Sequence, residues 1–238
     1  MAERSGAESL KVASARALQE VLRPLGAAFA SKVGAPVEFL FGPVGTVRER
    51  LEGGEVADVI ILSDTLIAAF AKSGRIVEAS RREIGRVGIT LAVRDGTPAP
   101  DISTPDLFKQ ALLSAHAIAC SDPAIGGSAG THFAALLQRL GIEGAVSHKL
   151  LKRSSGVKTA EAVASGEADI GITLLPEMLP VKGVYPAAPL PQALQKFTTY
   201  VAAVSTQCTV PQTGAAFIRA AADPGLDSSW RAAGVEPP

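Results

Sequence analysis

Three turns of the sequence place small polar residues and glycine directly after an apolar run, where a strand gives way to a helix. The first N–H groups of a helix have no partner within the helix, and the helix dipole is positive there. Such turns can hold an oxyanion without any net charge on the protein. Ser, Thr and Gly are also ordinary residues before a helix, so any one turn has a structural explanation, whereas three together favour an anion site. The turns are Ser14-Ala15-Arg16, the segment from Gly42 to Gly45 and Thr46, and the segment from Gly126 through Gly127, Ser128, Ala129 and Gly130 to Thr131.

Arg16 is the residue that indicates a specific ligand chemistry most directly. It opens a helical stretch, where the helix dipole disfavours a cation, and its planar guanidinium could clamp a carboxylate. The alternative is a solvated surface arginine. Arg153, followed by Ser154 and Ser155, could offer a second cationic edge, and the alternative is again a surface role.

Two residues near expected strand ends could move protons. His132 follows the glycine-rich turn, and Glu177 follows the apolar run 168–175. A structural histidine and a solvent-facing or paired glutamate are the plainer alternatives. The sequence shows no nucleophile elbow, no Walker loop, and neither Cys-x-x-Cys nor His-Glu-x-x-His. We therefore expect no metal site and no cofactor.

Composition excludes several classes of function. The chain has 238 residues, 47% of them hydrophobic, and 23 basic residues balance 23 acidic ones. A nucleic-acid surface would need a basic excess, so we expect no nucleic-acid partner. An anion must then be held by local groups, not by a global positive field. No apolar run reaches the roughly 20 residues that a membrane helix requires.

The compartment stays open at this point. The segment MAERSGAESL lacks the apolar core of a secretory signal. We expect a periplasmic protein if a leader was removed and a cytoplasmic protein if the sequence as given is complete. Cys120 and Cys208 are expected to be two buried thiols, with a disulfide as the alternative in an oxidising compartment.

Strands and helices are expected to alternate along most of the chain, and aromatic residues are only 5% of it, which suits parallel sheets covered by helices. A turn-rich segment, TPAPDISTPD, follows Gly96, and a second series of strands and helices begins after it. The strand-like segments 86–95 and 196–205 flank this middle block. Residues 1–90 with 200–238 are therefore expected to form a discontinuous lobe, with 91–199 as an inserted lobe. Strands are expected at 10–15, 36–42, 56–63, 86–96, 117–122, 148–154, 168–175 and 196–205, and helices at 17–33, 46–54, 64–71, 104–114, 131–141, 157–165 and 212–222, followed by a polar tail.

The stretches that carry these features resemble a known family. LKVASARALQEVLRPLGAAFASKVGAPVEFLFGPVGTVRERLEGGEVADVIILS, SDPAIGGSAGTHFAALLQRLGI and VASGEADIGITLLPEMLPVKGV are similar to bacterial extracellular solute-binding proteins of the molybdate-binding type. The strand RVGITLAVRDG also fits, and the resemblance covers about residues 10 to 205. It implies the type II periplasmic-binding-protein fold, with two α/β lobes of mixed, mostly parallel sheets that are joined by two crossing strands and close on a ligand.

The resemblance also implies where the ligand binds and which partner receives it. Family members contact the oxyanion through positions that match Ser14, Gly45 or Thr46, Gly127, Ser128 and Gly130, with a further position near Thr173. An ABC transporter permease is the implied partner, and a monomer is expected. Arg16 departs from the family pattern of neutral hydroxyls and amides, and a guanidinium there favours an organic carboxylate over a metal oxyanion.

Three functions are consistent with these observations. The first is a binding protein that delivers an oxyanion or an organic carboxylate to an ABC transporter. The second is an isomerase of a small polycarboxylate, because the family includes members that resemble aconitate isomerase; Arg16 would then stabilise an enolate-like anion, and Glu177 or His132 would carry the proton. The third and weakest is a cytoplasmic ligand sensor, since no DNA-binding segment is attached.

Overall fold

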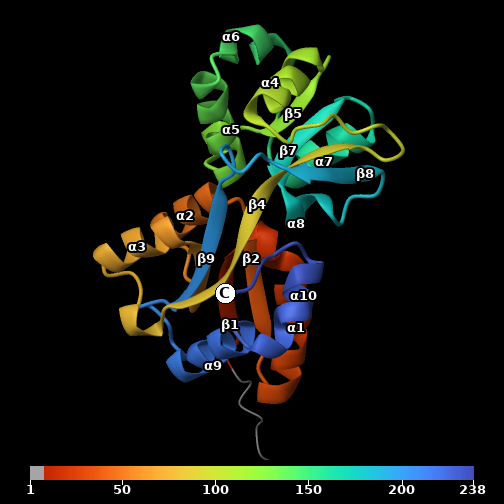
Figure 1. The fold of residues 1–238 in the computed structure, drawn as a ribbon. Coiled ribbons are helices and arrows are strands. Elements are labelled where there is room, and N and C mark those ends of the chain that lie inside the picture. The colour runs from red at the N-terminus through yellow and green to blue at the C-terminus, as the bar shows by residue number, and fades with distance from the viewer. Residues whose placement is uncertain (1–7) are drawn as a thin grey trace, which may run out of the picture. The chain divides into compact units, whose positions relative to one another are not determined.

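The apolar runs of the sequence form strands, and these strands divide between two compact units. The computed structural model describes residues 8–238 (Figure 1). One unit comprises the residues up to Arg86 together with Thr199–Pro238, and the other is Val87–Thr198. The chain passes from one unit to the other within two strands, β4 (Arg82–Arg94) and β9 (Phe197–Val204).

The sheet of the first unit is mostly parallel. Its strand β1 (Leu10–Ala15) pairs in parallel with β2 (Val37–Gly42) on one side and with β3 (Val59–Ser63) on the other. The strand β9 lies antiparallel to β3. Every residue of β3 is buried, as expected for an apolar strand that helices cover on both faces.

Helices of the first unit pack on this sheet through aromatic contacts. Phe29 of α1 (Gln19–Val33) meets Phe217 of α9 (Pro211–Ala221) edge to face, with ring centroids 5.3 Å apart. Gly26 leaves room for the ring of Phe39, because a Cβ at Gly26 would lie 2.5 Å from it. The remaining helical segments are η1 (Arg16–Leu18), α2 (Val44–Glu52), α3 (Asp64–Lys72), η2 (Glu78–Ser80), η5 (Pro224–Leu226) and α10 (Asp227–Ala232).

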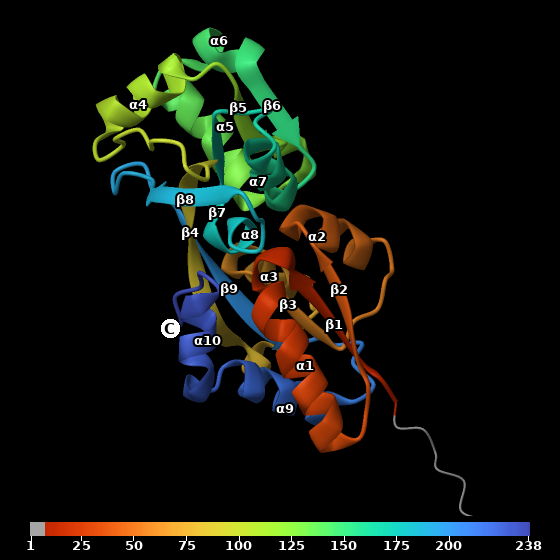
Figure 2. The same cartoon turned by 90° about the vertical axis from the view of Figure 1, so that its right-hand side faces the viewer.

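The polar tail expected after residue 222 is partly helical. Residues of the tail form η5 and α10, and Figure 2 shows α10 beside the chain end marked C. Trp230 of α10 is almost fully buried. Its indole N–H donates to the carbonyl oxygen of Ala221 at 3.2 Å. One large apolar side chain thus anchors a segment whose overall composition is polar.

The sheet of the second unit is mixed. The strand β5 (Ile118–Ser121) pairs in parallel with β6 (Leu150–Arg153) and with β7 (Ile170–Leu174). The strand β4 lies antiparallel to β7 and also to β8 (Val184–Pro189), a strand that the sequence did not predict. Two prolines in β8 break the usual strand pattern, and proline is tolerated in an edge strand.

Helices of the second unit begin where the parallel strands end. α5 (Ser128–Arg139), α7 (Gly156–Ala164) and α8 (Leu175–Met178) follow β5, β6 and β7 respectively. Other helical segments are α4 (Pro105–Ser114), η3 (Pro123–Ile125), α6 (Glu143–Val146) and η4 (Ser147–Lys149). None of the helices in the described part of the chain has the length and apolar character that a membrane crossing requires.

Candidate functional site

The carboxyl ends of three parallel strands meet at one edge of the first unit's sheet. Ala15 at the end of β1 lies beside Gly42 of β2, and Ser14 lies beside Ile61 of β3. Ser63 ends β3 two residues later. Ligands of open α/β sheets bind at such carboxyl edges, so the expected Ser14 and Ala15 lie where a ligand site would form.

The helix α2 begins at this edge without a side-chain cap. Its N-cap residue is Pro43, and no side chain accepts a hydrogen bond from its first turn. The N–H groups of Gly45 and Thr46 therefore belong to the unpaired first turn of a helix. Thr46 also lies against Gly42, because a Cβ on Gly42 would stand 3.9 Å from the Cβ of Thr46. The two predicted turns of the first unit are thus brought together.

Arg16 is the first residue of η1, at the same edge, and it is partly buried. Its Nε atom is buried and has no hydrogen-bond partner within the described residues. The Nε of Arg48 is also buried without a hydrogen bond, but it lies 3.7 Å from a carboxylate oxygen of Glu52, and Arg50 makes two hydrogen bonds to Glu55, at 2.5 and 2.8 Å. An unpaired buried donor costs free energy, so Arg16 holds a hydrogen-bonding position ready for an acceptor.

Ser63 is a residue of this edge that sequence reasoning missed. It is buried, and its hydroxyl oxygen lies 3.1 Å from that of Thr65 in the first turn of α3. The helix α3 has no side-chain cap from Ser63. A polar residue directly after the apolar run 59–62 was the signal that could have identified it.

In the second unit, the turn predicted at residues 126–131 is shorter in the structure, because α5 already begins at Ser128. Gly126 has a positive φ of 73° and ends η3, and Gly127 is the N-cap of α5. Ser128, Ala129, Gly130 and Thr131 already form the first turn of α5. No side chain caps this turn either, so its N–H groups point out at the carboxyl end of β5.

Two residues of this turn have packing roles of their own. A Cβ on Gly130 would overlap the backbone of Ser121, so glycine allows α5 to approach the end of β5. The hydroxyl of Thr131 donates to the carbonyl oxygen of Gly127 at 3.0 Å. The backbone of this turn, together with Ser128, therefore carries the anion-binding potential of this unit.

Thr173 and Glu177 form a buried cluster at the carboxyl end of β7. The hydroxyl of Thr173, which is fully buried, donates to Oε2 of Glu177 at 3.1 Å. Gly156 at the start of α7 packs against both, since a Cβ there would overlap the two side chains. The Thr173 hydroxyl proton is thus directed at a carboxylate, and Glu177, at 9% exposure, is the paired glutamate of the plainer expectation and not a solvent-facing one.

Two other candidates are engaged elsewhere in the second unit. Arg153 forms an ion pair with Glu167, with Nη2 2.6 Å from Oε2. A ring nitrogen of His132 lies 2.8 Å from the carbonyl oxygen of Leu194. The ion pair supports a surface role for Arg153, and the hydrogen bond supports a structural role for His132.

Both cysteines are free thiols. Burial raises the pKa of Cys120 to about 11. Burial also raises the pKa of Cys208 to about 11, and the neighbouring Asp58 adds to the shift. Within residues 8–238, His, Cys, Asp and Glu nowhere gather in a group of three that could hold a metal ion.

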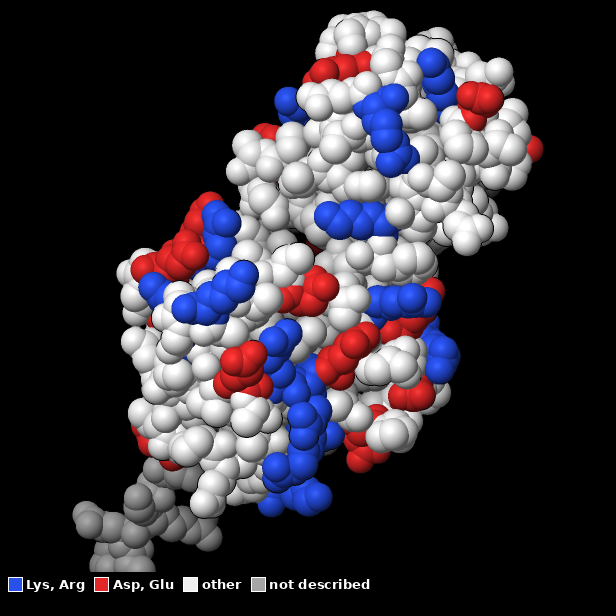
Figure 3. All heavy atoms as spheres, turned by 60° about the vertical axis from the view of Figure 1, so that its left-hand side comes forward, with Lys and Arg blue, Asp and Glu red and all other residues white. Residues whose placement is uncertain are grey.

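Both signs of charge occur on the face drawn in Figure 3, where a run of basic residues in the lower part has acidic residues on either side. This agrees with the formal net charge of zero. Any preference for an anion must therefore come from oriented N–H groups, hydroxyls and individual cations.

Comparison with known proteins gives the fold and the family. Aconitate isomerase from a Pseudomonas species is 27% identical over 235 residues, which cover 96% of this chain and 88% of that protein. The periplasmic molybdate-binding protein of Azotobacter vinelandii matches with a TM-score of 0.77 at 22% identity, over 96% of this chain and 99% of that one. The sulfate-binding protein of Mycobacterium tuberculosis H37Rv matches with a TM-score of 0.74 at 18% identity, over 97% and 87% of the two chains.

These structural matches show that the chain has the type II fold of periplasmic binding proteins, as the sequence predicted. The profile of a family described as bacterial extracellular solute-binding protein matches residues 10–236, which is nearly the whole chain. The chain belongs to the family of bacterial extracellular solute-binding proteins.

Proposed function

We propose that this protein binds a small organic anion with at least one carboxylate group and delivers it to an ABC-type uptake system. The observation that carries this proposal is the buried, unpartnered Nε of Arg16 at the carboxyl edge of the first unit's sheet. A guanidinium presents parallel N–H groups that match the two oxygens of a carboxylate.

Neighbouring groups at this edge would complete the hold on the anion. The first-turn N–H groups of α2 and the hydroxyl of Ser14 supply neutral donors. The Ser14 hydroxyl donates a long hydrogen bond, 3.3 Å, to the adjacent carbonyl oxygen of Ala15. Its hydroxyl can rotate toward a ligand at little cost, because the bond it gives up is weak.

The second unit would contribute through the uncapped first turn of α5, Ser128 above all. We propose that the two units act as the two lobes of a solute-binding protein. A ligand that contacts both lobes would stabilise the closed arrangement, because it binds that arrangement more tightly than the open one. The protein would act as a monomer.

A thermal-shift screen with molybdate, tungstate, sulfate, citrate and aconitate tests the ligand class. A ligand that binds only the folded protein raises the melting temperature by mass action. We expect citrate or aconitate to raise it and Arg16→Ala to abolish that rise. A rise with molybdate or tungstate that survives in Arg16→Ala would contradict the carboxylate assignment and favour a metal oxyanion.

A second function, isomerisation of a small polycarboxylate, is favoured by the Thr173–Glu177 pair. A glutamate held in a buried site by a threonine hydroxyl is a suitable group to take a proton from one carbon of an allylic system and return it at the other end. The similarity to aconitate isomerase is consistent with this chemistry. His132 is the weaker candidate for the proton-transfer group, because its ring nitrogen is already hydrogen-bonded to the carbonyl oxygen of Leu194.

Proton NMR of the protein incubated with cis-aconitate distinguishes the two functions. An isomerase would convert it to trans-aconitate, and Glu177→Gln would lose turnover while it still binds the substrate. Binding without turnover at micromolar protein would leave the transport function and exclude the isomerase.

We propose a periplasmic location, as for the extracellular family to which the chain belongs. Residues 1–7, which bear on a leader, lie outside the described residues. Cell fractionation of the native host tests the location, and recovery in the cytosol alone would support the sensor alternative.

A further inference from the structure

Two strands carry the chain from one unit to the other, and one of them, β4, is held on both sides of the crossing. The unit boundary falls after Arg86. Beyond this boundary β4 pairs with β7 and β8 from Ile89 onward. Before the boundary, Arg86 forms an isolated antiparallel bridge with Glu236, which follows α10. Val87 and Gly88 are therefore the residues that separate the bridge from the pairing with β7 and β8.

The bridge at Arg86 is made by the backbone. The N–H of Arg86 donates to the carbonyl oxygen of Glu236 at 2.7 Å, and the N–H of Glu236 donates to the carbonyl oxygen of Arg86 at 2.9 Å. The side chains add an ion pair, with Nε 2.8 Å from Oε2, but both are about half exposed, so this pair contributes little. We call residues 235–236 the strap, because they hold β4 through backbone hydrogen bonds.

The strap is itself anchored within the first unit. Val235 is almost fully buried, and its N–H donates to the carbonyl oxygen of Trp230 at 2.9 Å. Gly85 of β4 leaves room for the strap, since a Cβ there would stand 2.6 Å from the carbonyl oxygen of Glu236 and 2.8 Å from the Val235 side chain. The strap and β4 are therefore closely packed, and a side chain at residue 85 would push them apart.

A single side chain holds β4 on the other side of the crossing, within the second unit. Oε1 of Gln195 accepts a hydrogen bond from the N–H of Ile89, and Nε2 of Gln195 donates to the carbonyl oxygen of Ile89, both at 2.9 Å. The amide group thus pairs with the backbone of β4 as a neighbouring strand would. Gly88 allows this close approach, because a Cβ there would stand 3.2 Å from Nε2 of Gln195 and 3.2 Å from the ring of Phe197.

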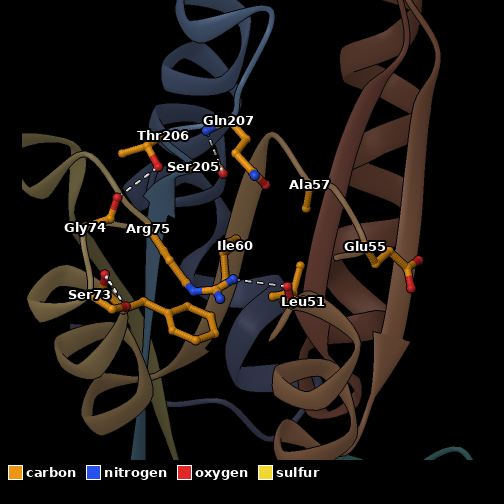
Figure 4. Close-up of a pocket in the computed structure, with 11 residues that line it drawn as sticks. Leu51, Glu55, Ala57, Ile60, Ser73, Gly74, Arg75, Ser205, Thr206 and Gln207 are labelled. Carbon is orange, nitrogen blue, oxygen red and sulfur yellow. Dashed lines mark hydrogen bonds between the residues drawn. The ribbon is translucent and has the colours of Figure 1, made fainter. Parts of the chain in front are cut away.

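The other crossing strand, β9, is held in the first unit from Tyr200 onward. Its residues from Tyr200 to Val204 pair with β3. In the segment that follows, the hydroxyl of Thr206 donates to the carbonyl oxygen of Gly74 at 3.0 Å (Figure 4). The N–H of Thr206 donates to the carbonyl oxygen of Arg75, also at 3.0 Å. Bending of β9 is therefore left to the residues before Tyr200.

We propose that the strap and Gln195 confine the bending between the two units to Val87 and Gly88 in β4 and to residues 196–199 in β9. Hinge motions are absorbed by a few residues of this kind. Confinement reduces the number of arrangements that the ligand-free protein samples, so less conformational entropy is lost when a ligand fixes one of them. Release of the strap should therefore weaken binding although no residue of the candidate site changes. The confinement stands on contacts within each unit, whereas its effect on affinity rests on the proposed function.

Glu236→Pro releases the strap, because proline has no N–H to donate to Arg86. Glu236→Gln is the matched control, since it removes the ion pair and keeps both backbone hydrogen bonds. Residual dipolar couplings of the isotope-labelled full chain measure how far the two units reorient independently, and they need no ligand. We expect the difference between the alignment magnitudes of the two units to increase in Glu236→Pro and in Gln195→Leu. In Glu236→Gln it should stay as in the native protein. Circular dichroism checks that each variant is folded.

Calorimetric titration with citrate measures the effect on affinity. We expect Glu236→Pro to raise the Kd roughly three- to tenfold, which corresponds to one lost backbone hydrogen bond, and Glu236→Gln to leave it unchanged. Unchanged couplings in Glu236→Pro would overturn the proposal, and so would an equal response of Glu236→Gln. Altered couplings with an unaltered Kd would overturn the link to affinity. If the native protein binds no citrate, the proposed carboxylate ligand is contradicted, and the couplings alone decide whether the strap confines the motion.

Discussion

Replacing Arg16 by methionine is expected to move stability and affinity in opposite directions. Methionine keeps most of the apolar length of the arginine stem and removes the guanidinium. The Nε donor that is buried without a partner disappears, so the ligand-free protein should become more stable. The carboxylate loses its charged partner, so the complex should become weaker. A residue retained for packing would not give this pair of signs.

The magnitudes follow from the contacts. An unsatisfied buried donor costs about 1–3 kcal/mol, and the lower end applies because Arg16 is only partly buried. About 1 kcal/mol corresponds to a rise of roughly 2–4 °C in Tm for a chain of this size. Loss of a charge-assisted hydrogen bond, worth about 1.5–3 kcal/mol, should raise the Kd for the carboxylate roughly 10- to 150-fold.

Urea unfolding followed by circular dichroism measures the first quantity, and calorimetric titration with citrate or aconitate measures the second. Arg231→Met is a matched control, because Arg231 is an exposed arginine whose ion pair with Asp227 is long, at 3.7 Å. It should change neither quantity appreciably. If Arg16→Met destabilises the protein and leaves the Kd unaltered, Arg16 is a structural residue and the reasoning about an anion site fails.

Other substitutions test the packing around both units. Gly156→Ala should destabilise the second unit by about 1–3 kcal/mol, because the new Cβ would displace the Glu177 side chain, and a urea midpoint at or above that of the native protein would contradict this contact. Gly26→Ala should also destabilise despite the better helix propensity of alanine, since its Cβ would stand 2.5 Å from the Phe39 ring; a rise in Tm would show that the ring moves aside. The raised pKa of Cys120, about 11, means that its neutral thiol stabilises the fold fully below about pH 9 and that this contribution is lost as the pH rises through 11. Cys120→Ala should flatten the decline of stability between about pH 9 and 11, as denaturation at several pH values would show.

Much of the architecture could be predicted because continuous apolar runs and their bounding turns report directly on buried strands. The run that becomes β3 has no polar residue before Ser63, so it required cover on both faces. The strand β8 escaped prediction because its prolines weaken the strand pattern and its pairing with β4 is non-local. The helix α10 escaped for a similar reason, since a single buried Trp230 supplies its anchor.

The candidate site was predictable only where it depends on local sequence. Ser14 lies near the end of one apolar strand and Thr46 follows another, and that order alone places them at a carboxyl edge. Thr173 and Glu177 contact Gly156, and this contact joins the end of β7 to the start of α7. The sequence of neither segment predicts that the two segments meet. Thr173 and Glu177 could be named as single candidates, but their grouping required the fold.

The pattern of satisfied and unsatisfied donors gives the strongest argument that the carboxyl edges have a function. The chain caps α4 with Thr104 and α7 with Ser155, whereas α2, α3, α5 and α10 begin without a side-chain cap. It also begins α9 with Pro211, which has no N–H to satisfy. The uncapped first turn of α2 contains the buried Gly45, and the unpaired guanidinium nitrogen of Arg16 lies at the same edge. Unpaired donors cost stability, and their concentration at one edge is explained if an anion supplies the missing acceptors.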